Sequence, residues 1–130
     1  MEQATGEFDL TGWDEQPYEE YETGKLTRAS VTQDFTGDIQ GTGKVEWLMC
    51  YREDGTADFV GMQGIEGTVD GRRGVFVSTT VGTFDGELAR GTWTIVNGSG
   101  RGELSGIGGR GEFNATHGPT AEFHISYELG

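Results

Sequence analysis

Four two-residue turn signals divide most of this chain into segments of similar length. They are Asp54-Gly55, Asp70-Gly71, Asp85-Gly86 and Asn97-Gly98, and their glycines fall 16, 15 and 12 residues apart. Asp-Gly and Asn-Gly are the pairs most typical of tight β-hairpin turns, because both central residues of such a turn take a positive φ. Turns spaced so regularly predict a series of hairpins in which each strand pairs with the next.

The segments between these turns show the alternation of apolar and polar residues that is typical of β-strands. Eight strands are predicted, at residues 7–11, 26–35, 45–52, 56–69, 75–84, 88–96, 111–114 and 121–129. Further turns are predicted at Gly37-Asp38 and at residues 117–119. The glycines at positions 41 and 43 indicate a bulge or a bend just before the third strand.

Residues 91–113 are unusually rich in glycine, in a chain that holds 24 glycines and only two prolines. A helix of useful length is unfavourable here, because each glycine costs roughly 1 kcal/mol relative to alanine. Leu104 and Ile107 are the only large apolar side chains between residues 98 and 111. We expect both to insert into apolar space from one side of a compact loop.

Eight antiparallel strands in chain order, without helices, leave two sheet edges and one apolar face to be covered. Closing the sheet into an up-and-down barrel covers both at once. We therefore predict an all-β protein with a single domain, residues 1–130, folded as an eight-stranded antiparallel up-and-down β-barrel; a two-sheet sandwich is the alternative. The interior of such a barrel is either just filled by side chains or able to hold one small ligand.

Residues 14–23 are the longest stretch without strand character. The stretch is acidic, contains Pro17, and carries two tyrosines, Tyr18 and Tyr21. Loops with aromatic and charged side chains are typical of segments that lie over a binding site. We predict a mobile flap near one mouth of the barrel rather than a strand.

The formal net charge of −13 argues against two classes of partner. Nucleic acid and anionic membrane surfaces would both repel such a chain. Its apolar runs are far shorter than the roughly 18 residues that a membrane-spanning segment needs. No signal peptide is recognisable, so the sequence predicts a cytoplasmic protein.

Three segments resemble a bacterial family: WDEQPY at residues 13–18, LTRASVTQDFTGDIQGTGKVEWLMCYREDGTADFVG at residues 26–61, and GTWTIVNGSGRGELSGIGGRGEF at residues 91–113. They are similar to the family catalogued as domain of unknown function 3224, which belongs with the allene oxide cyclase-like barrels. The spacing of glycines over residues 98–109 also resembles, more distantly, plant allene oxide cyclases and dirigent proteins.

The resemblance implies an eight-stranded antiparallel barrel with a mostly apolar cavity. Relatives in that superfamily direct ring closure or coupling of hydrophobic, reactive substrates without a metal or an organic cofactor. They often form dimers or trimers through the barrel wall. The resemblance carries no catalytic residue over to a position in this sequence.

The strands at residues 45–52 and 56–69 carry apolar residues on both faces. In the first of them, Trp47, Met49 and Tyr51 share one face, while Leu48 and Cys50 lie on the other. If one face lines the interior, the other is available to a partner subunit. We therefore expect a homodimer or another homo-oligomer. Alternation alone does not say which face points inward.

An apolar pocket inside the barrel is the predicted ligand site, because large aromatic residues beside many glycines leave irregular space. The predicted ligand-binding residues are Trp47, Met49, Tyr51, Phe59, Gln63, Trp93 and Phe123. The candidate catalytic residues are Glu46, Tyr51, Glu66 and His124, with Arg28 as a further polar candidate. A buried Glu46 or Glu66 would have a raised pKa and could act as an acid or a base.

Other kinds of chemistry find little support in the sequence. Residues 106–111 match the dinucleotide-binding fingerprint, but no helix can follow them, so we expect no nucleotide site. Two histidines without metal-ligand spacing predict no metal, and we expect no other cofactor. Cys50 is the single cysteine, which excludes an internal disulfide, and we expect it to be buried as a small apolar side chain.

Three functional hypotheses follow from these observations. The first is a cofactor-free cyclase or isomerase that holds a hydrophobic small molecule in its reactive conformation inside the barrel. The second is a non-catalytic carrier or binding protein for an apolar small molecule. The third is an oligomerising protein whose barrel is completely filled.

Overall fold

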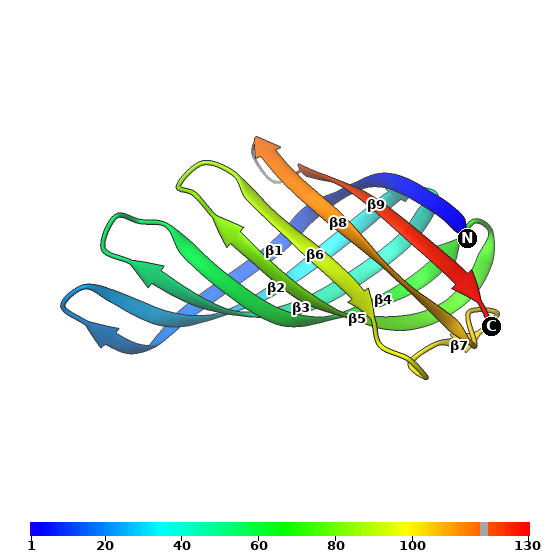
Figure 1. Ribbon diagram of the computed structural model, residues 1–130, viewed down its shortest axis with the longest axis horizontal. Helices are drawn as coiled ribbons and strands as arrows, with labels where there is room; N and C mark the ends of the chain where they lie inside the picture. Colours follow the sequence, from blue (N-terminus) through cyan, green and yellow to red (C-terminus); the bar gives the residue numbers. More distant parts are fainter. Residues whose placement is uncertain (118–119) are drawn as a thin grey trace.

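A computed structural model describes residues 1–117 and 120–130 of the chain (Figure 1). The regular elements in these residues are β1 (Glu2–Tyr21), β2 (Gly24–Gly37), β3 (Ile39–Arg52), β4 (Ala57–Val69), β5 (Arg72–Phe84), β6 (Ala89–Ile95), β7 (Arg101–Gly102), β8 (Ile107–His117) and β9 (Thr120–Leu129). The described chain contains no helix of the length and apolar character needed to cross a membrane. The turn predicted at residues 117–119 falls partly outside the described residues.

The eight longer strands form one closed antiparallel barrel. Each pairs with the next along the chain, and β1 pairs with β9 from Glu2 opposite Tyr127 to Asp9 opposite Thr120, which closes the sheet. The predicted eight-stranded antiparallel barrel is therefore confirmed. The short strand β7 was not predicted; it lies in the connection between β6 and β8 and pairs with β5.

The turn between β4 and β5 shows why Asp-Gly pairs mark the hairpins. Asp70 and Gly71 have φ values of 49° and 83°, as a two-residue type I′ turn requires. Glycine takes such values without a steric penalty, and aspartate tolerates them better than most residues. The turns predicted after β3 and β5, at residues 54–55 and 85–86, are present as well.

One end of the barrel is closed by the connection between β6 and β8, residues 96–106. Leu104 and Ile107 are buried there in the hydrophobic core, as the sequence predicts. Several hydrogen bonds fasten the connection to β5; among them, Val96 N donates to Val77 O at 2.8 Å, and Val77 N donates to Ser99 Oγ at 3.0 Å. Both chain termini lie at this closed end (Figure 1).

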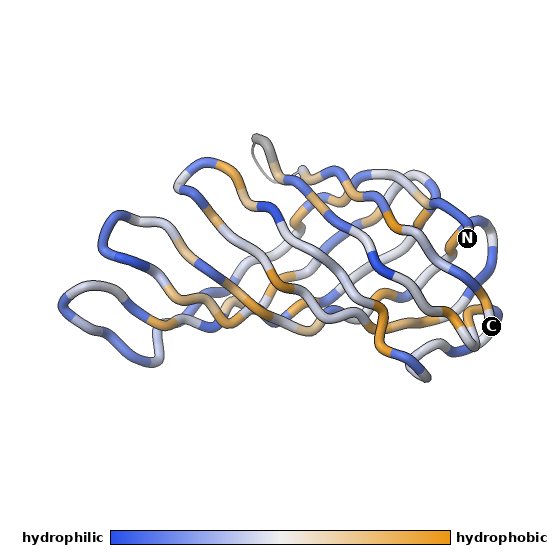
Figure 2. Tube along the Cα trace, viewed as in Figure 1, coloured by the Kyte–Doolittle hydropathy of each residue, from blue (hydrophilic) through white to orange (hydrophobic). Residues whose placement is uncertain are grey.

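The β1–β2, β3–β4 and β5–β6 hairpins project from the opposite, open end, and Figure 2 shows hydrophilic residues at and near their tips. Beyond Asp9, β1 no longer pairs with β9 but still pairs with β2 as far as Tyr21. The prediction that residues 14–23 are not a strand is therefore wrong for residues 14–21. One edge of β1 is unpaired in this region, so Pro17, which cannot donate a ladder hydrogen bond, is tolerated.

A β-bulge at Thr11 changes which residues of β1 point into the barrel. The pairing with β2 shifts between Leu10 and Gly12, so that Thr11 is one extra residue. Such a shift moves all following side chains to the opposite face. Even-numbered residues point inward before the bulge, and odd-numbered residues, including Trp13 and Glu15, point inward after it, as far as a second shift between Pro17 and Glu19.

Inward-facing glycines make room for the aromatic rings of neighbouring strands. A Cβ built on Gly61 would lie 2.6 Å from Cδ1 of Trp47, and one on Gly82 would lie 2.4 Å from Cζ of Phe59. The same relation joins Gly43 to Phe35 and Gly91 to Phe113. The middle of the barrel is thus filled largely by aromatic rings that glycine admits.

Three smaller expectations need correction. The pairing of β3 with β4 runs from Ile39 to Tyr51 without a shift, so the glycines at positions 41 and 43 form no bulge. β1 begins at Glu2 rather than at residue 7, and β8 has 11 residues rather than the four at 111–114. Glycine has no side chain to show alternation, so the glycine-rich start of β8 lacked a strand signal.

Candidate functional site

A pocket of about 230 Å³ lies at the open end of the barrel. It is lined by Phe8, Leu10, Trp13, Trp47, Met49, Tyr51, Phe59, Phe84, Glu87, Ala89, Phe113, Ala115 and Ala121. Most of these side chains are aromatic or aliphatic, and every long strand except β2 contributes at least one. The volume is below the roughly 300–1,000 Å³ of sites for drug-sized ligands, so the pocket suits a small ring system.

Trp47 connects the pocket to the aromatic core. Its ring centroid lies 5.3 Å from that of Phe59, 5.9 Å from that of Trp13 and 6.4 Å from that of Phe113. Rings at such separations attract one another beyond the effect of their burial. The aromatic wall is therefore held in place by ring contacts from four strands.

Tyr51 and Glu15 form a hydrogen-bonded polar pair beside the pocket. Tyr51 OH donates to Glu15 Oε2 at 2.9 Å, and Thr27 Oγ1 donates to the same oxygen at 2.6 Å. Trp13 Nε1 donates to Glu15 Oε1 at 3.3 Å. Burial, followed by the hydrogen bond to Glu15, raises the pKa of Tyr51 to about 12. The phenol therefore stays protonated at neutral pH and remains a hydrogen-bond donor.

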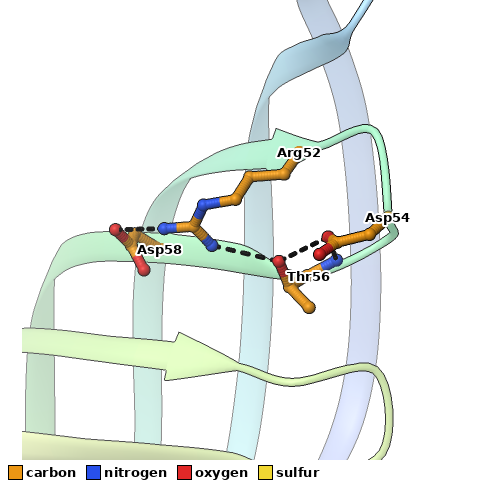
Figure 3. A network of polar contacts seen from close by, with 4 residues as sticks. All are labelled: Arg52, Asp54, Thr56 and Asp58. Atoms are coloured by element: carbon orange, nitrogen blue, oxygen red, sulfur yellow. Dashed lines mark hydrogen bonds and ion pairs between the residues drawn. The ribbon is translucent and has the colours of Figure 1, made fainter.

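The β3–β4 hairpin, which begins next to Tyr51, carries a polar network of four residues (Figure 3). Arg52 Nη2 lies 2.7 Å from Asp58 Oδ2, and Arg52 Nη1 donates to Thr56 Oγ1 at 3.1 Å. Asp54 Oδ1 accepts from the hydroxyl of Thr56 at 2.6 Å and from its N–H at 3.0 Å, which lowers the pKa of Asp54. The network braces the turn and pairs the charge of Arg52 with a carboxylate.

Glu87 brings a second carboxylate to the pocket, from the turn between β5 and β6. Asp85 shapes this turn, because its Oδ1 accepts from the N–H of Leu88 at 2.7 Å and of Glu87 at 2.9 Å. These bonds lower the pKa of Asp85. Neither Glu87 nor Glu15 forms an ion pair within the part of the chain that the structure describes.

The predicted ligand-binding residues divide into two groups. Trp47, Met49, Tyr51 and Phe59 line the pocket together. Trp93 and Phe123 lie in the core, with ring centroids 5.7 Å apart. Gln63 is buried with Gln33 and Ser78, donating to Gln33 Oε1 at 2.8 Å and accepting from Ser78 Oγ at 3.0 Å. Trp93, Phe123 and Gln63 therefore do not line the pocket.

Three of the four candidate catalytic residues lie on the outer wall, because even-numbered residues of β3, β4 and β9 point outward. They are Glu46, Glu66 and His124. Glu46 accepts from Ser30 Oγ at 2.8 Å and lies 2.7 Å from Arg28 Nη2. These contacts lower its pKa, the Ser30 bond first, and Glu46 is not buried, so the condition under which a raised pKa was expected is not met. Of the candidates, only Tyr51 borders the pocket.

Cys50 also lies on the outer wall and is exposed, which corrects the expectation that it is buried. The same alternation explains its position, since Met49 and Tyr51 on either side point inward. Arg28, the further polar candidate, is engaged outside the barrel with Glu46 at 2.9 Å through Nε.

Several residues of the site were not predicted, among them Trp13, Phe84, Glu87 and Phe113, which line the pocket, and Glu15, which lies beside it. Trp13 and Glu15 lie beyond the bulge, where the sequence shows no strand pattern. Glu87 belongs to a turn, for which alternation gives no direction. Phe84 and Phe113 could have been predicted, because alternation along each strand places them on the same face as the inward-facing residues.

The sequence matches one family over almost its whole length. A family model described as Protein of unknown function (DUF3224) matches residues 4–127. The chain belongs to this family. A crystal structure of a DUF3224 family protein of unknown function from Shewanella oneidensis MR-1 is similar over 100% of this chain and 98% of that chain, with a TM-score of 0.80 and 25% sequence identity. No curated protein matches the sequence.

The pocket of this DUF3224 barrel offers a limited set of chemical groups. Its aromatic walls can hold an apolar body, the Tyr51 hydroxyl, whose one proton is donated to Glu15, can accept a hydrogen bond, and the carboxylates of Glu15 and Glu87 can accept a proton or attract a positive charge. Within the described residues, no group of three or more histidine, cysteine, aspartate or glutamate side chains could hold a metal ion.

Proposed function

We propose that this protein binds a small, largely apolar molecule in the pocket at the open end of its barrel. The observation that carries the proposal is the pocket of about 230 Å³ between aromatic rings, at the end that the β6–β8 connection does not close. Apolar walls with a few well-placed polar groups are the usual composition of small-molecule sites. Tyr51 and Glu15 are such polar groups.

A matched pair of substitutions tests this proposal. Ala89→Phe adds a ring to the pocket wall on β6, whereas Thr92→Phe adds the same ring to the outer face of that strand. Binding of 2-naphthalenemethanol, a small uncharged bicyclic probe, is measured by calorimetry. We expect the wild type and Thr92→Phe to bind it, and Ala89→Phe to lose about tenfold or more in affinity, which is about 1.4 kcal/mol. Absence of binding to the wild type, or equal affinities of the two variants, would overturn the proposal.

A second candidate function is catalysis by a cofactor-free isomerase or cyclase. The hydrogen bond from Tyr51 to Glu15 beside the pocket favours it. The Glu15 carboxylate can accept a proton from a bound molecule, and as its negative charge is lost, the Tyr51 O–H can turn from Glu15 to the molecule and stabilise negative charge that develops on its oxygen. Transfer of a proton from the carbon next to a carbonyl group is the simplest reaction that this pair supports.

Hydrogen exchange into a bicyclic ketone tests the second candidate. 2-Tetralone is incubated with the protein in D₂O, and the loss of its α-hydrogens is followed by NMR. A catalyst should accelerate this loss above the buffer rate, and Glu15→Gln should remove the acceleration. Exchange at the buffer rate while tetralone is bound would exclude this chemistry and leave binding alone.

A further inference from the structure

We infer that the pocket prefers cations, so that its ligand is a small aromatic or otherwise apolar amine in its protonated form rather than an acid. This inference rests on the proposed function, because it names the class of molecule that the same pocket takes. Three features carry it: carboxylates without a cationic partner, a wall of aromatic faces, and an excess of acidic residues around the mouth.

The two carboxylates at the pocket have no positive charge bound to them. Glu15 accepts hydrogen bonds from neutral groups only, the hydroxyls of Tyr51 and Thr27 and the indole of Trp13. Glu87 forms no ion pair within the described chain, and no lysine or arginine lines the pocket. An ammonium group in the pocket would supply the missing positive charge, whereas a carboxylate ligand would add a third negative charge beside two that are already present.

The contacts place one cationic side chain, Lys25, beside the pair formed by Tyr51 and Glu15. Its Nζ lies 5.3 Å from the centroid of the Tyr51 ring, over an aromatic face rather than against a carboxylate. The contact indicates that a ring of this site already attracts an ammonium group. It leaves the charges of Glu15 and Glu87 uncompensated.

The aromatic wall favours the same sign of charge. Indole, phenol and phenyl faces carry negative partial charge, and an ammonium group within about 6 Å of a ring centroid is attracted to them. Trp47 lies 5.9 Å from Trp13 and 5.3 Å from Phe59 between ring centroids. In a cavity of about 230 Å³, a bound cation is therefore close to more than one of these rings.

The charges around the mouth extend this preference beyond the pocket. The projecting hairpins carry the acidic residues Glu19, Glu20, Glu22, Glu53, Asp54 and Asp85. The arginine of the β3–β4 hairpin, Arg52, is neutralised by Asp58 at 2.7 Å. Arginines 72, 73 and 101 lie instead at the closed end. An excess of one charge sign around a mouth raises the local concentration of ligands of the opposite sign.

Three probes with the same ring system test the inference. They are 2-naphthalenemethanamine, which is an ammonium ion at neutral pH, the uncharged 2-naphthalenemethanol, and the anionic 2-naphthoic acid. Dissociation constants are measured by calorimetry at pH 7 in low salt. We expect the amine to bind about fivefold to thirtyfold more tightly than the alcohol, and the acid to bind most weakly.

Charge-removing variants locate the source of the preference. Glu15→Gln and Glu87→Gln should each reduce the affinity ratio of amine to alcohol, because each removes a negative charge that attracts the ammonium group. Glu66→Gln removes the same charge from the outer wall of β4, and the ratio should stay at the wild-type value. Measurable binding of the alcohol shows that a variant still has a pocket.

The possible results separate this inference from the proposed function. An alcohol that binds as tightly as the amine, or an acid that binds best, overturns the preference for cations and leaves small-molecule binding intact. If none of the three probes binds, both proposals fail. A preference that survives both Glu15→Gln and Glu87→Gln would come from the overall charge of the molecule and would overturn the assignment to the pocket.

Discussion

The substitution Gly61→Ala tests whether inward-facing glycines exist to admit aromatic rings. An ideal Cβ at this position lies 2.2 Å from the carbonyl oxygen of Glu46 and 2.6 Å from Cδ1 of Trp47. Non-bonded heavy atoms are best separated by about 3.5–4.0 Å, so roughly 1 Å of displacement is required. Gly64→Ala on the same strand is the matched control, because a Cβ there meets nothing within 4 Å.

The cost follows from what would have to move. Trp47 is 6% exposed and packs against Phe59, so its ring has little free space. The carbonyl of Glu46 belongs to backbone that is fixed in the ladder between β3 and β4. Over-packing of this kind costs about 1–3 kcal/mol. Gly64→Ala should instead stabilise the protein by about 0.4–1 kcal/mol, because alanine restricts the unfolded chain.

Urea unfolding followed by tryptophan fluorescence measures both variants against the wild type. The free energy of unfolding comes from the midpoint and the slope of each transition, and an unchanged slope indicates that the variants can be compared. We expect the two variants to differ by roughly 1.5–4 kcal/mol, with Gly61→Ala the less stable. Equal stabilities, or a Gly61→Ala variant more stable than the wild type, would refute the explanation of the glycine pattern.

Three further predictions concern the pocket and the outer wall. Trp47→Ala should lower the free energy of unfolding by about 3–5 kcal/mol and weaken binding of 2-naphthalenemethanol; lost stability with unchanged affinity would assign Trp47 to the core alone. The raised pKa of Tyr51 means that the neutral phenol stabilises the fold below pH 10 and that this contribution disappears as the pH rises through about 12. The difference in phenolate absorbance between the wild type and Tyr51→Phe should therefore be centred near pH 12, and a midpoint near pH 10 would contradict it. We also propose that the chain forms a homodimer through the outer face of β3, β4 and β5, where Leu48, Val60 and Val81 form one cross-strand row and are 46%, 50% and 58% exposed. Light scattering should give twice the mass of the 14.1 kDa chain, Val60→Lys should halve it, and a monomeric wild type would disprove the dimer.

The turns made the barrel predictable from sequence. Asp70 and Gly71 occupy backbone conformations that few residue types accept, so their pairing is informative without any knowledge of the rest of the fold. The segment at residues 14–21 was missed for the converse reason. It projects beyond the barrel and is held by pairing with β2, so it needs no apolar face and shows no alternation.

The pocket was only partly predictable. Alternation along β3 placed Trp47, Met49 and Tyr51 on one face, but Leu48 made the opposite face apolar as well. Only the closed barrel shows which of the two faces points inside. Glu15 depends on a single extra residue in β1, whose presence no local sequence feature marks. One inserted residue therefore decides whether a carboxylate reaches the pocket or points away from it.

The ladder between β1 and β9 makes completion of the fold depend on the last strand of the chain. Every other pair of long strands joins segments that follow one another in the chain, through a short loop or, between β6 and β8, through residues 96–106, and can form early. Closing the seam from Glu2–Tyr127 to Asp9–Thr120 instead brings together opposite ends of the chain. During synthesis the growing sheet has two unpaired edges until residues 120–129 have left the ribosome, and such edges invite pairing with other chains. A chain shortened by β9 would keep the β1–β2, β3–β4 and β5–β6 hairpins and still be an open, aggregation-prone sheet.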